Sequence, residues 1–505
     1  YWERTVTQGK DILLNQESLF KAHKNQRSEV NSKLTSSESK ELLKLSKKLL
    51  RASTQEILLG SFINAFRRES GFDDCLMSLE GHGRESYAEL ADCESTIGWF
   101  TSIYPFTYNS KNKSDVQVYR EIKDCLRGVP AKGFSFLPLR FYGSSEVNES
   151  LSIKPEISFN YLGESARDEQ SSWLNSEREE VGCDHGIQVV EPFKLDVLAS
   201  VRDGCIELML KGLDLSDSVS IQGLNDGWLA ELKNLLNWLR DIENSIVAGK
   251  LTPHPSLLSA SDCVANFSSL SELDRALSEI PLPPLSVEEV MPLTGVQSGM
   301  LMHCSFDDEA YQDQVSLRLH QAIDSAKFES AVKALVAETA ALRTGFLQSS
   351  SGEALQLVFR SREGFYNFID GQSWDSEIEI ELDRLRIDLR DQKVDLLNDS
   401  LFRLTLVRLG PDLFDLIIDF HHIAIDGWSS SLLLKRLEEF YFEEAQFGDQ
   451  GAVRSMKHYF QWLQQQPTLE SRKYWQSLIG DYEGRVEVPS SVPRTSTDKF
   501  EPIFS

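Results

Sequence analysis

The sequence predicts a mixed α/β protein, an α+β sandwich of helices and sheets arranged as two lobes joined by a linker. Three observations predict this class. Helical and strand-like periodicities alternate along most of the chain. A stretch rich in proline and serine at 250–287 separates two such blocks. The 505 residues suffice for two or three domains of ~150 residues each.

The first block, residues 1–249, starts with apolar residues at helical spacing over 38–69, which predict a helix. The pattern then predicts five β-strands, at residues 75–80, 97–104, 157–162, 193–201 and 205–210. The last two form a predicted hairpin that turns at Asp203-Gly204. An amphipathic helix that Asn225 or Asp226 can cap closes the block.

The linker at 250–287 contains one short helical patch at 270–277, and we expect it to lie against a surface rather than act as a free tether. The second block is again mixed. Its expected strands are 315–319, 402–407 and 413–420, and its expected helices are 326–341, 429–445 and 456–479. Residues 488–505 show no convincing pattern.

The chain carries 52 basic and 78 acidic side chains, a formal net charge of −26. This surplus of negative charge argues against non-specific binding to the phosphate backbone of a nucleic acid, which requires basic patches. The seven cysteines are scattered and form no Cys-x-x-Cys pair, so we expect reduced thiols in a cytoplasmic protein. No apolar run approaches the ~20 residues of a membrane span. Because the chain starts at Tyr1 without a methionine or a signal peptide, we expect a piece of a longer protein.

The sharpest motif is HHIAIDGWS at 421–429, which directly follows a predicted buried strand. Adjacent residues of a strand point to opposite faces, so His421 and His422 cannot share one task, and one of them should enter a cavity. Asp426 could pair with a buried arginine, and Gly427 would allow backbone geometry that other residues forbid. Two alternatives stay open: a pair of structural histidines, and a metal site, although no further His or Cys lies at ligand spacing nearby.

This run resembles the HHxxxDG signature of the condensation domains of non-ribosomal peptide synthetases. The segment PLTGVQSGML at 292–301 is similar to the first motif of that family, in the form usual for condensation domains that follow an epimerization domain. The segment ALRTGF at 341–346 resembles the end of the second motif, whose usual Arg-His-Glu start is replaced here by Glu-Thr-Ala at 338–340. The resemblance leaves Arg343 as the arginine expected to pair with Asp426.

Segments of the first block resemble motifs of epimerization domains, which are relatives of condensation domains with the same fold. They are EGHGRE at 80–85, GWFT at 98–101, FNYLG at 159–163 and a looser KGFSF at 132–136 that lacks the usual tyrosine. Within FNYLG, Asn160 and Tyr161 are expected to support the site. The motifs occur in family order and cover nearly the whole chain.

Glu80 ends a predicted strand beside two glycines, where a substrate backbone can approach closely. Removal of a weakly acidic Cα proton needs a base with a raised pKa, which partial burial of Glu80 would give. Reprotonation needs a second acid, by resemblance a histidine of an HHxxxD motif, and no such motif precedes Glu80 here. The alternative is that Glu80 and Glu85 pair with Arg84 and only hold the loop.

The resemblance implies two chloramphenicol-acetyltransferase-like lobes with the active site in a tunnel between them. Residues 1–249 correspond to the C-terminal lobe of an epimerization domain, 250–287 to an interdomain linker and 288–505 to the N-terminal lobe of a condensation domain. The implied reactions are L-to-D epimerization of a carrier-bound aminoacyl or peptidyl thioester and then amide formation with the downstream aminoacyl carrier. His422 is the expected inward-facing residue, and the N–H of Gly427 is an expected oxyanion donor.

The implied partners are the peptidyl carrier and adenylation domains of the same synthetase, in antibiotic or other secondary-metabolite biosynthesis. Substrates would ride on the 4′-phosphopantetheine arms of the carriers, with no cofactor or metal bound directly. Each active site is then only half present in this chain. This leaves as an alternative a carrier-docking or scaffold fragment without turnover, or lobes that pair across chains.

Overall fold

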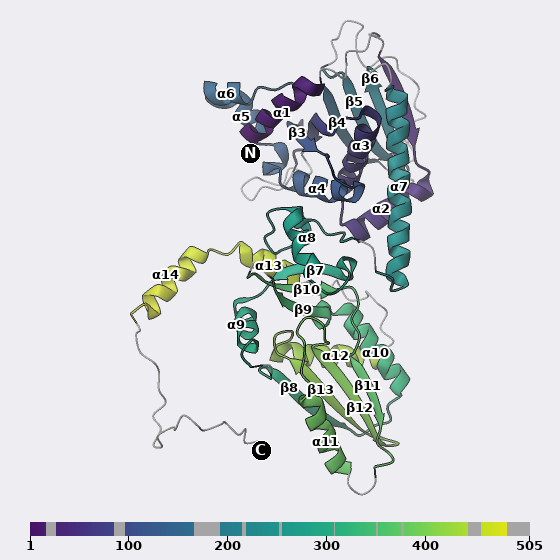
Figure 1. Cartoon of the computed structure of the whole chain (residues 1–505), viewed down its shortest axis with the longest axis vertical. Helices are drawn as coiled ribbons and strands as arrows, with labels where there is room; N and C mark the ends of the chain where they lie inside the picture. The colour runs from purple at the N-terminus through teal and green to yellow at the C-terminus, as the bar shows by residue number, and fades with distance from the viewer. Residues whose placement is uncertain are drawn as a thin grey trace. The chain divides into compact units, whose positions relative to one another are not determined.

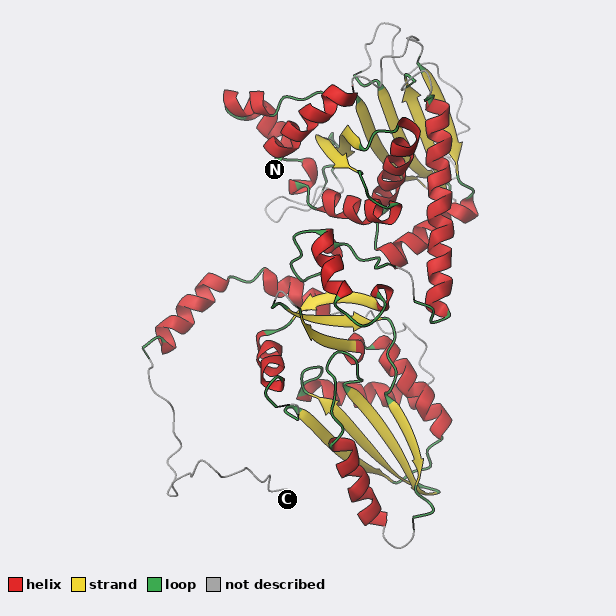
Figure 2. Cartoon of the chain, viewed as in Figure 1, coloured by secondary structure: helices red, strands yellow, loops and turns green. Residues whose placement is uncertain are grey.

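The computed structural model describes residues 1–16, 27–84, 96–165, 192–214, 219–251, 255–307, 309–349, 352–374, 378–442 and 456–481. The chain divides into two compact units, Tyr1–Val453 and Arg454–Ser505. Helices and sheets alternate throughout the first unit, which confirms the predicted α/β class (Figure 2). The lobe boundaries at 249/250 and 287/288 stay predictions, and the sequence did not predict the division after Val453.

A six-stranded sheet organises the first half of the larger unit, with strand order β1-β6-β5-β4-β2-β3 (Figure 1). Its strands are β1 (Ser28–Lys33), β2 (Asp74–Gly81), β3 (Ser102–Asn109), β4 (Ile157–Ser165), β5 (Leu195–Arg202) and β6 (Cys205–Gly212). The predicted hairpin is confirmed, because β5 and β6 pair antiparallel around Asp203 and Gly204, whose φ angles of 49° and 72° suit a two-residue turn. Strand β4 lies parallel to both β2 and β5, which brings residues distant in sequence side by side.

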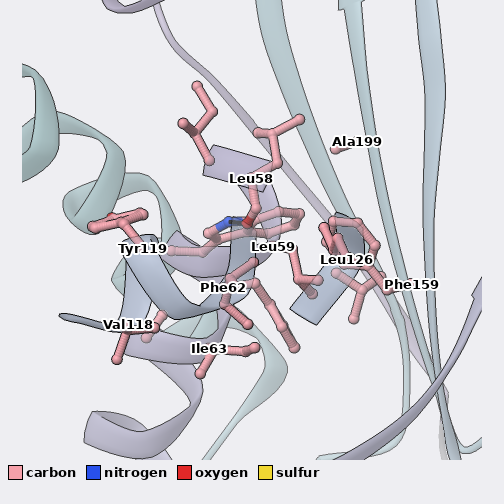
Figure 3. Packing of buried hydrophobic residues seen from close by; sticks show 14 of the residues in the cluster. Leu58, Leu59, Phe62, Ile63, Val118, Tyr119, Leu126, Phe159 and Ala199 are labelled. Atoms are coloured by element: carbon pink, nitrogen blue, oxygen red, sulfur yellow. Dashed lines mark hydrogen bonds between the residues drawn. The ribbon is translucent and has the colours of Figure 1, made fainter. Parts of the chain in front are cut away.

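Helices α2 (Ser36–Leu45), α3 (Thr54–Ser70) and α7 (Ile221–Val247) bury the core face of this sheet. In Figure 3, Phe62 of α3 lies among Leu58, Leu59 and Phe159, and the rings of Phe62 and Phe159 are 6.3 Å apart. The amphipathic helix predicted from the leucine spacing is confirmed as α7, but its cap is Ser220, whose side chain accepts from the Gly223 N–H. The predicted capping residues Asn225 and Asp226 lie inside the helix instead.

The remaining helices of this half are α1 (Trp2–Gln16), α4 (Asp115–Arg127), α5 (Phe136–Tyr142) and α6 (Ser145–Ser150). Helix α1 packs against β2 and β3 through Gly9, where an added Cβ would lie 3.1 Å from a Leu76 methyl group. Leu76 and Glu80 have the same parity along β2, so α1 covers part of the sheet face that carries Glu80.

Two sequence predictions in this half are wrong in detail. The stretch 38–69 is not one helix, because a π-helical turn at Ser46–Leu50 leads to Arg51 with φ 53°, and Ser53 then caps α3 through a capping box. The leucine spacing continues across this break and hides it. The stretch 97–104 becomes a strand only from Ser102, because Ile97 and Trp99 are exposed in a preceding loop.

The segment that follows α7 is folded onto both neighbouring halves, so the expectation that it lies against a surface is confirmed, whereas its role as an interdomain linker stays a prediction. Its helix α8 (Leu270–Ser278) shares a hydrophobic core with strands of the second half. On the other side, Lys123 of α4 forms a fully buried ion pair with Asp262 at 2.5 Å, and Arg120 holds Asp274 with two hydrogen bonds. Breaking one partner of such a buried pair is costly, so these contacts fix the segment in place.

Two smaller sheets organise the second half of the larger unit, with orders β7-β10-β9 and β11-β12-β13-β8. Their strands are β7 (Val287–Pro292), β8 (Gln312–Leu319), β9 (Thr344–Gln348), β10 (Ala354–Phe359), β11 (Tyr366–Asp370), β12 (Phe402–Gly410) and β13 (Leu413–His421). Helices α10 (Ser325–Glu338) and α12 (Gly427–Phe442) pack on one face of the four-stranded sheet, and α11 (Ile378–Arg390) packs on the other (Figure 2). The predicted strands and the helix at 326–341 are confirmed, with small shifts at their ends.

The second unit is described only over helices α13 (Met456–Gln464) and α14 (Thr468–Ile479). The single helix predicted at 456–479 is therefore wrong. Pro467 separates the two helices, because proline lacks the N–H that a continuing helix would need. The predicted residues 443–445 and 488–505 lie outside the described part of the chain.

Candidate functional site

The carboxylate of Glu80 lies near the end of β2, opposite strand β4. The two strands pair in register at Leu79 and Phe159, both of which are buried in the core. The next residue on each strand must therefore point to the opposite face. There Asn160 Nδ2 donates to Glu80 Oε2 at 2.6 Å, so the EGHGRE and FNYLG segments meet through one hydrogen bond.

Burial raises the pKa of Glu80, as the sequence predicts, and the negative charge of Asp196 raises it further. Asp196 lies on β5, which pairs with the other edge of β4, and its Oδ1 accepts from the Ser158 hydroxyl at 2.7 Å. Its other oxygen pairs with Arg27 at 3.2 Å. Asp196 was not predicted from the sequence, since nothing in the pattern of β5 separates it from other polar residues on that face. Both effects move the pKa of Glu80 towards the range in which a carboxylate works as a base near neutral pH.

The loop after Glu80 is built on backbone contacts. Gly83 has φ 65°, and a Cβ there would lie 1.8 Å from the carbonyl oxygen of Phe100, so only glycine fits. The Arg84 guanidinium donates to the carbonyls of Thr96 and Gly98 and lies 4.3 Å from the Phe100 ring centre. Arg84 therefore ties EGHGRE to the GWFT segment. Glu85, its alternative partner, lies outside the described residues.

Tyr161 follows Asn160 on β4 and packs against the hydrophobic core on the other side of the sheet. Burial raises the pKa of its phenol, and a hydrogen bond to Thr54 at the start of α3 lowers it in part. The structure thus brings Asn160, but not Tyr161, to Glu80.

The two histidines at the end of β13 have different surroundings, as the strand alternation predicts. His421 is 3% exposed, and its Nδ1 accepts from the Ile423 N–H at 3.1 Å. Burial and the neighbouring His422 lower the pKa of His421 to about 4, so its ring is neutral at pH 7. A neutral ring that accepts at Nδ1 carries its proton on Nε2, which lies 3.6 Å from Cys304 Sγ. His421 is therefore a packed structural residue.

The ring of His422 lies on the other side of the strand end and is 33% exposed. Its Nε2 is 2.8 Å from Oδ2 of Asp313, on the adjacent strand β8, and its Nδ1 is 3.4 Å from the carbonyl oxygen of Ile425. The Phe420 ring packs edge-on at 5.3 Å. Of the two histidines, His422 is thus the one that a substrate can reach.

The expected pairing of Arg343 with Asp426 is wrong. Arg343 is buried, and its guanidinium contacts Glu288 of β7 at 2.7 Å and the carbonyls of Val336 and Phe359. It therefore holds the turn after α10 against the three-stranded sheet and does not aim the histidine loop.

Asp426 instead caps α12, where Oδ1 accepts from the N–H and the hydroxyl of Ser429 at 2.8 and 2.6 Å. These two bonds lower the pKa of Asp426, in the manner of a helix N-cap carboxylate. Gly427 is the first residue of α12 and does not have a positive φ, and a Cβ there would meet open space, so the expected need for special backbone geometry is wrong. Its N–H remains at the positive end of the helix dipole.

The helix α9 (Gly295–Cys304) joins the first condensation motif to the histidine loop. Thr294 and Gln297 form a capping box at its start, and Gln297 Nε2 also donates to the carbonyl of Ile423 at 2.9 Å. The Thr-x-x-Gln spacing is visible in the sequence and predicts the cap, but the contact with Ile423 is not visible there.

Among the described residues, no group of three or more His, Cys, Asp or Glu side chains could hold a metal ion. In the same part of the chain, no helix is long and apolar enough to cross a membrane.

Comparison with known proteins decides the family. Residues 1–219 and 287–502 match the family described as the condensation domain. The chain belongs to the condensation-domain family. The unmatched interval of this condensation-family chain, 220–286, contains all of α7 and nearly all of the predicted linker.

Curated relatives of the chain are large synthases. It is 27% identical over 458 residues to a component of the mycosubtilin synthase of Bacillus subtilis, covering 89% of this chain and 17% of the relative. It is 28% identical over 462 residues to a component of the linear gramicidin synthase of Brevibacillus parabrevis, covering 89% and 6%. It is 26% identical over 463 residues to bacitracin synthase 1 of Bacillus licheniformis, covering 89% and 8%. The chain thus spans less than a fifth of the length of these relatives.

Two similar solved structures each match over about half of their own length. The epimerization domain from the third module of tyrocidine synthetase B is 26% identical with a TM-score of 0.39, over 43% of this chain and 49% of that chain. The starter condensation domain of rhizomide synthetase is 18% identical with a TM-score of 0.35, over 39% and 49%.

Proposed function

We propose that this chain carries the C-terminal lobe of an epimerization domain, followed by the N-terminal lobe of a condensation domain, within a non-ribosomal peptide synthetase. The observation that carries the proposal is the hydrogen bond between Glu80 and Asn160, which joins two segments that resemble epimerization motifs. The second half holds the HHxxxDG run at the end of β13. Single alignments that span 89% of the chain in synthase relatives support the continuity of the two halves.

In the first half, the Glu80 carboxylate takes the Cα proton of a carrier-bound aminoacyl or peptidyl thioester. The negative charge that develops is spread into the thioester carbonyl, and a proton returned to the opposite face gives the D configuration. The raised pKa of Glu80 suits this role, because a base is most efficient when its pKa lies near the working pH. The second acid is expected from the other lobe of the epimerization domain.

In the second half, the amine of the downstream aminoacyl carrier attacks the upstream thioester carbon. A C–N bond forms, the C–S bond breaks, and the proton lost by nitrogen ends on the released thiol. His422 is partly exposed at the strand end, where it can orient the amine. The N–H of Gly427, at the N-terminus of α12, can stabilise the oxyanion of the tetrahedral intermediate.

The partners of this reaction are the upstream and downstream carrier domains and the adenylation domains of the same synthetase. The substrates arrive as thioesters on 4′-phosphopantetheine arms, so the chain itself needs no bound cofactor for either step. Because the chain has a net charge of −26, we expect docking of an acidic carrier to rely on apolar contacts and local basic patches.

The proposal is tested with His422→Ala in the synthetase that carries this chain. We expect peptide bond formation to fall by at least ~10²-fold, while loading of both carriers, measured by mass spectrometry, continues unchanged. His320→Ala, which changes an exposed histidine at the end of β8, is the matched control. Product formation at the parental rate in His422→Ala would refute the condensation role.

A further inference from the structure

His422 has a carboxylate partner that belongs to none of the motifs. Asp313 lies 109 residues earlier in the chain, on β8, and its Oδ2 is 2.8 Å from Nε2 of His422. The side chain of Asp313 is 55% exposed, and His422 is its partner among the described residues. The contact is therefore a feature of the histidine site rather than part of a wider ion-pair network.

The register of the sheet creates this contact. Strands β8 and β13 pair antiparallel, with Asp313 opposite Phe420 and Gln312 opposite His421. His422 lies two residues beyond Phe420, so it shares the face of Asp313 and is its diagonal neighbour across the strands. The ladder continues past the strand end, because the His422 N–H donates to the carbonyl of Tyr311 at 2.9 Å.

The backbone at Tyr311 is held in an unusual conformation. Its φ is 64°, a left-handed value that a bulky residue rarely adopts, and its phenol lies 3.1 Å from Nδ1 of His303. Conformations of this kind persist where surrounding contacts over-determine them, and they cluster at functional sites. Tyr311 thus fixes the start of β8, from which Asp313 reaches the histidine.

The imidazole of His422 is restrained on three sides. Asp313 faces Nε2, the carbonyl of Ile425 faces Nδ1 at 3.4 Å, and the Phe420 ring packs edge-on at 5.3 Å. Ile425 offers a distant acceptor and Phe420 offers no hydrogen bond, so the short contact with Asp313 is the one that sets the ring orientation. A carboxylate oxygen can only accept, so the short contact with Asp313 places an N–H at Nε2.

We propose that Asp313 is the positioning residue of the condensation half, and that its carboxylate holds the Nε2–H of His422 so that the ring meets the incoming amine in one orientation. The inference rests on the proposed function and adds to it, because it names the group through which His422 is aimed. With Nε2–H directed at Asp313, Nδ1 is the nitrogen left to accept from the incoming amine, because its own contact with the Ile425 carbonyl is long at 3.4 Å.

The test compares two variants of Asp313 that differ in whether an acceptor oxygen remains. Asp313→Ala removes the acceptor, whereas Asp313→Asn keeps an amide oxygen that can still accept from Nε2–H. In the synthetase, we expect Asp313→Ala to lower kcat for amide formation about 10- to 100-fold with little change in KM, as a misplaced reacting group does, and Asp313→Asn to stay within ~3-fold of the parent. Asp412→Ala, an exposed aspartate at the other end of β13, is the control.

A spectroscopic readout separates positioning from a loss of folding. In the ¹⁵N-histidine-labelled chain, the Nε2–H signal of His422, assigned by its loss in His422→Gln, should be protected from exchange in the parent and in Asp313→Asn and lost in Asp313→Ala. Parental kcat in Asp313→Ala, or a persistent Nε2–H signal there, overturns the inference, and so does an equal loss in Asp313→Asn and Asp313→Ala. If His422→Ala itself leaves amide formation intact, the proposed function fails instead.

Discussion

Glu80 and His422 are both motif residues near the end of a strand, yet they obtain their partners in different ways. Glu80 is half-buried on a sheet face and bonds to Asn160, which belongs to a second motif on the neighbouring parallel strand. His422 lies just beyond β13 and contacts Asp313, a residue that belongs to no recognised motif. In the first case burial sets the protonation behaviour, and in the second the contacts of the ring set its orientation.

The difference teaches how far a motif describes a site. Glu80 and Asn160 both lie in segments that resemble family motifs, so both residues were candidates from the sequence. In the histidine motif, His421 is packed inside the protein and Asp426 caps α12. Arg343 binds Glu288 of the neighbouring sheet. What remains is one exposed imidazole whose partner comes from the paired strand.

The largest expected effect that bears on this comparison is that of Asn160→Ala. Its amide donates to the carboxylate of Glu80, and a hydrogen bond to a charged group contributes about 1.5–3 kcal/mol. We therefore expect the rate of deuterium exchange at the substrate Cα to fall about 10- to 100-fold. The acid limb of its pH profile should move to higher pH, because the charged form of Glu80 loses a donor.

Asn31→Ala is the matched control for this change, since Asn31 makes a similar bond to Glu29 on the exposed strand β1. Equal exchange rates in Asn160→Ala and Asn31→Ala would show that the hydrogen bond between Asn160 and Glu80 does not support proton removal.

A smaller effect of opposite sign is expected from Asp196→Asn. The negative charge of Asp196 raises the pKa of Glu80, so its removal should lower that pKa. Because the base must be deprotonated to act, the acid limb of the exchange profile should move to lower pH. Measurement of the rate from pH 4 to 8 checks this, and a shift in the same direction as that of Asn160→Ala would contradict the electrostatic account.

The smallest effect on either reaction is expected from His421, which is buried as a neutral ring and acts on stability. Its pKa in the folded chain is about 4, below the ordinary value near 6.5, so the unfolded state binds a proton first as the pH falls. The stability that depends on the neutral ring is fully present above pH 6.5 and is lost between about pH 6.5 and 4. His421→Asn should reduce the fall in unfolding free energy over this window by an amount on the order of 3 kcal/mol.

Urea unfolding at several pH values measures this difference, with the exposed His320→Asn as the control. Parallel pH dependences in the parent and His421→Asn would mean that the ring is not buried in the neutral form.

Much of the fold follows from the sequence. The alternation in β12 and β13, the Asp-Gly turn between β5 and β6, and the leucine spacing of α7 each correspond to one local physical rule. The failures have physical reasons as well. The apolar stripe at 38–69 continues across the left-handed Arg51, and a turn at Pro467 interrupts a helical pattern that the surrounding residues maintain.

The candidate site was predictable only in part. The choice of Glu80 and Asn160 as site residues and the opposite faces of His421 and His422 follow from motif resemblance and strand alternation. The hydrogen bond between Glu80 and Asn160 was not predicted. Asp313 and Asp196 could not be found, because their roles depend on which strands are neighbours and in which register. The resemblance left Arg343 as the expected partner of Asp426, but Arg343 pairs with Glu288 on β7 instead.

The measurement that tests the central claim most directly is solvent deuterium wash-in at the substrate Cα, followed by mass spectrometry of the carrier-bound thioester. We predict that Glu80→Gln abolishes wash-in and leaves the L configuration, whereas His422→Ala stops amide formation and leaves wash-in intact. Deuterium incorporation at the parental rate in Glu80→Gln would contradict the assignment of the first half to epimerization.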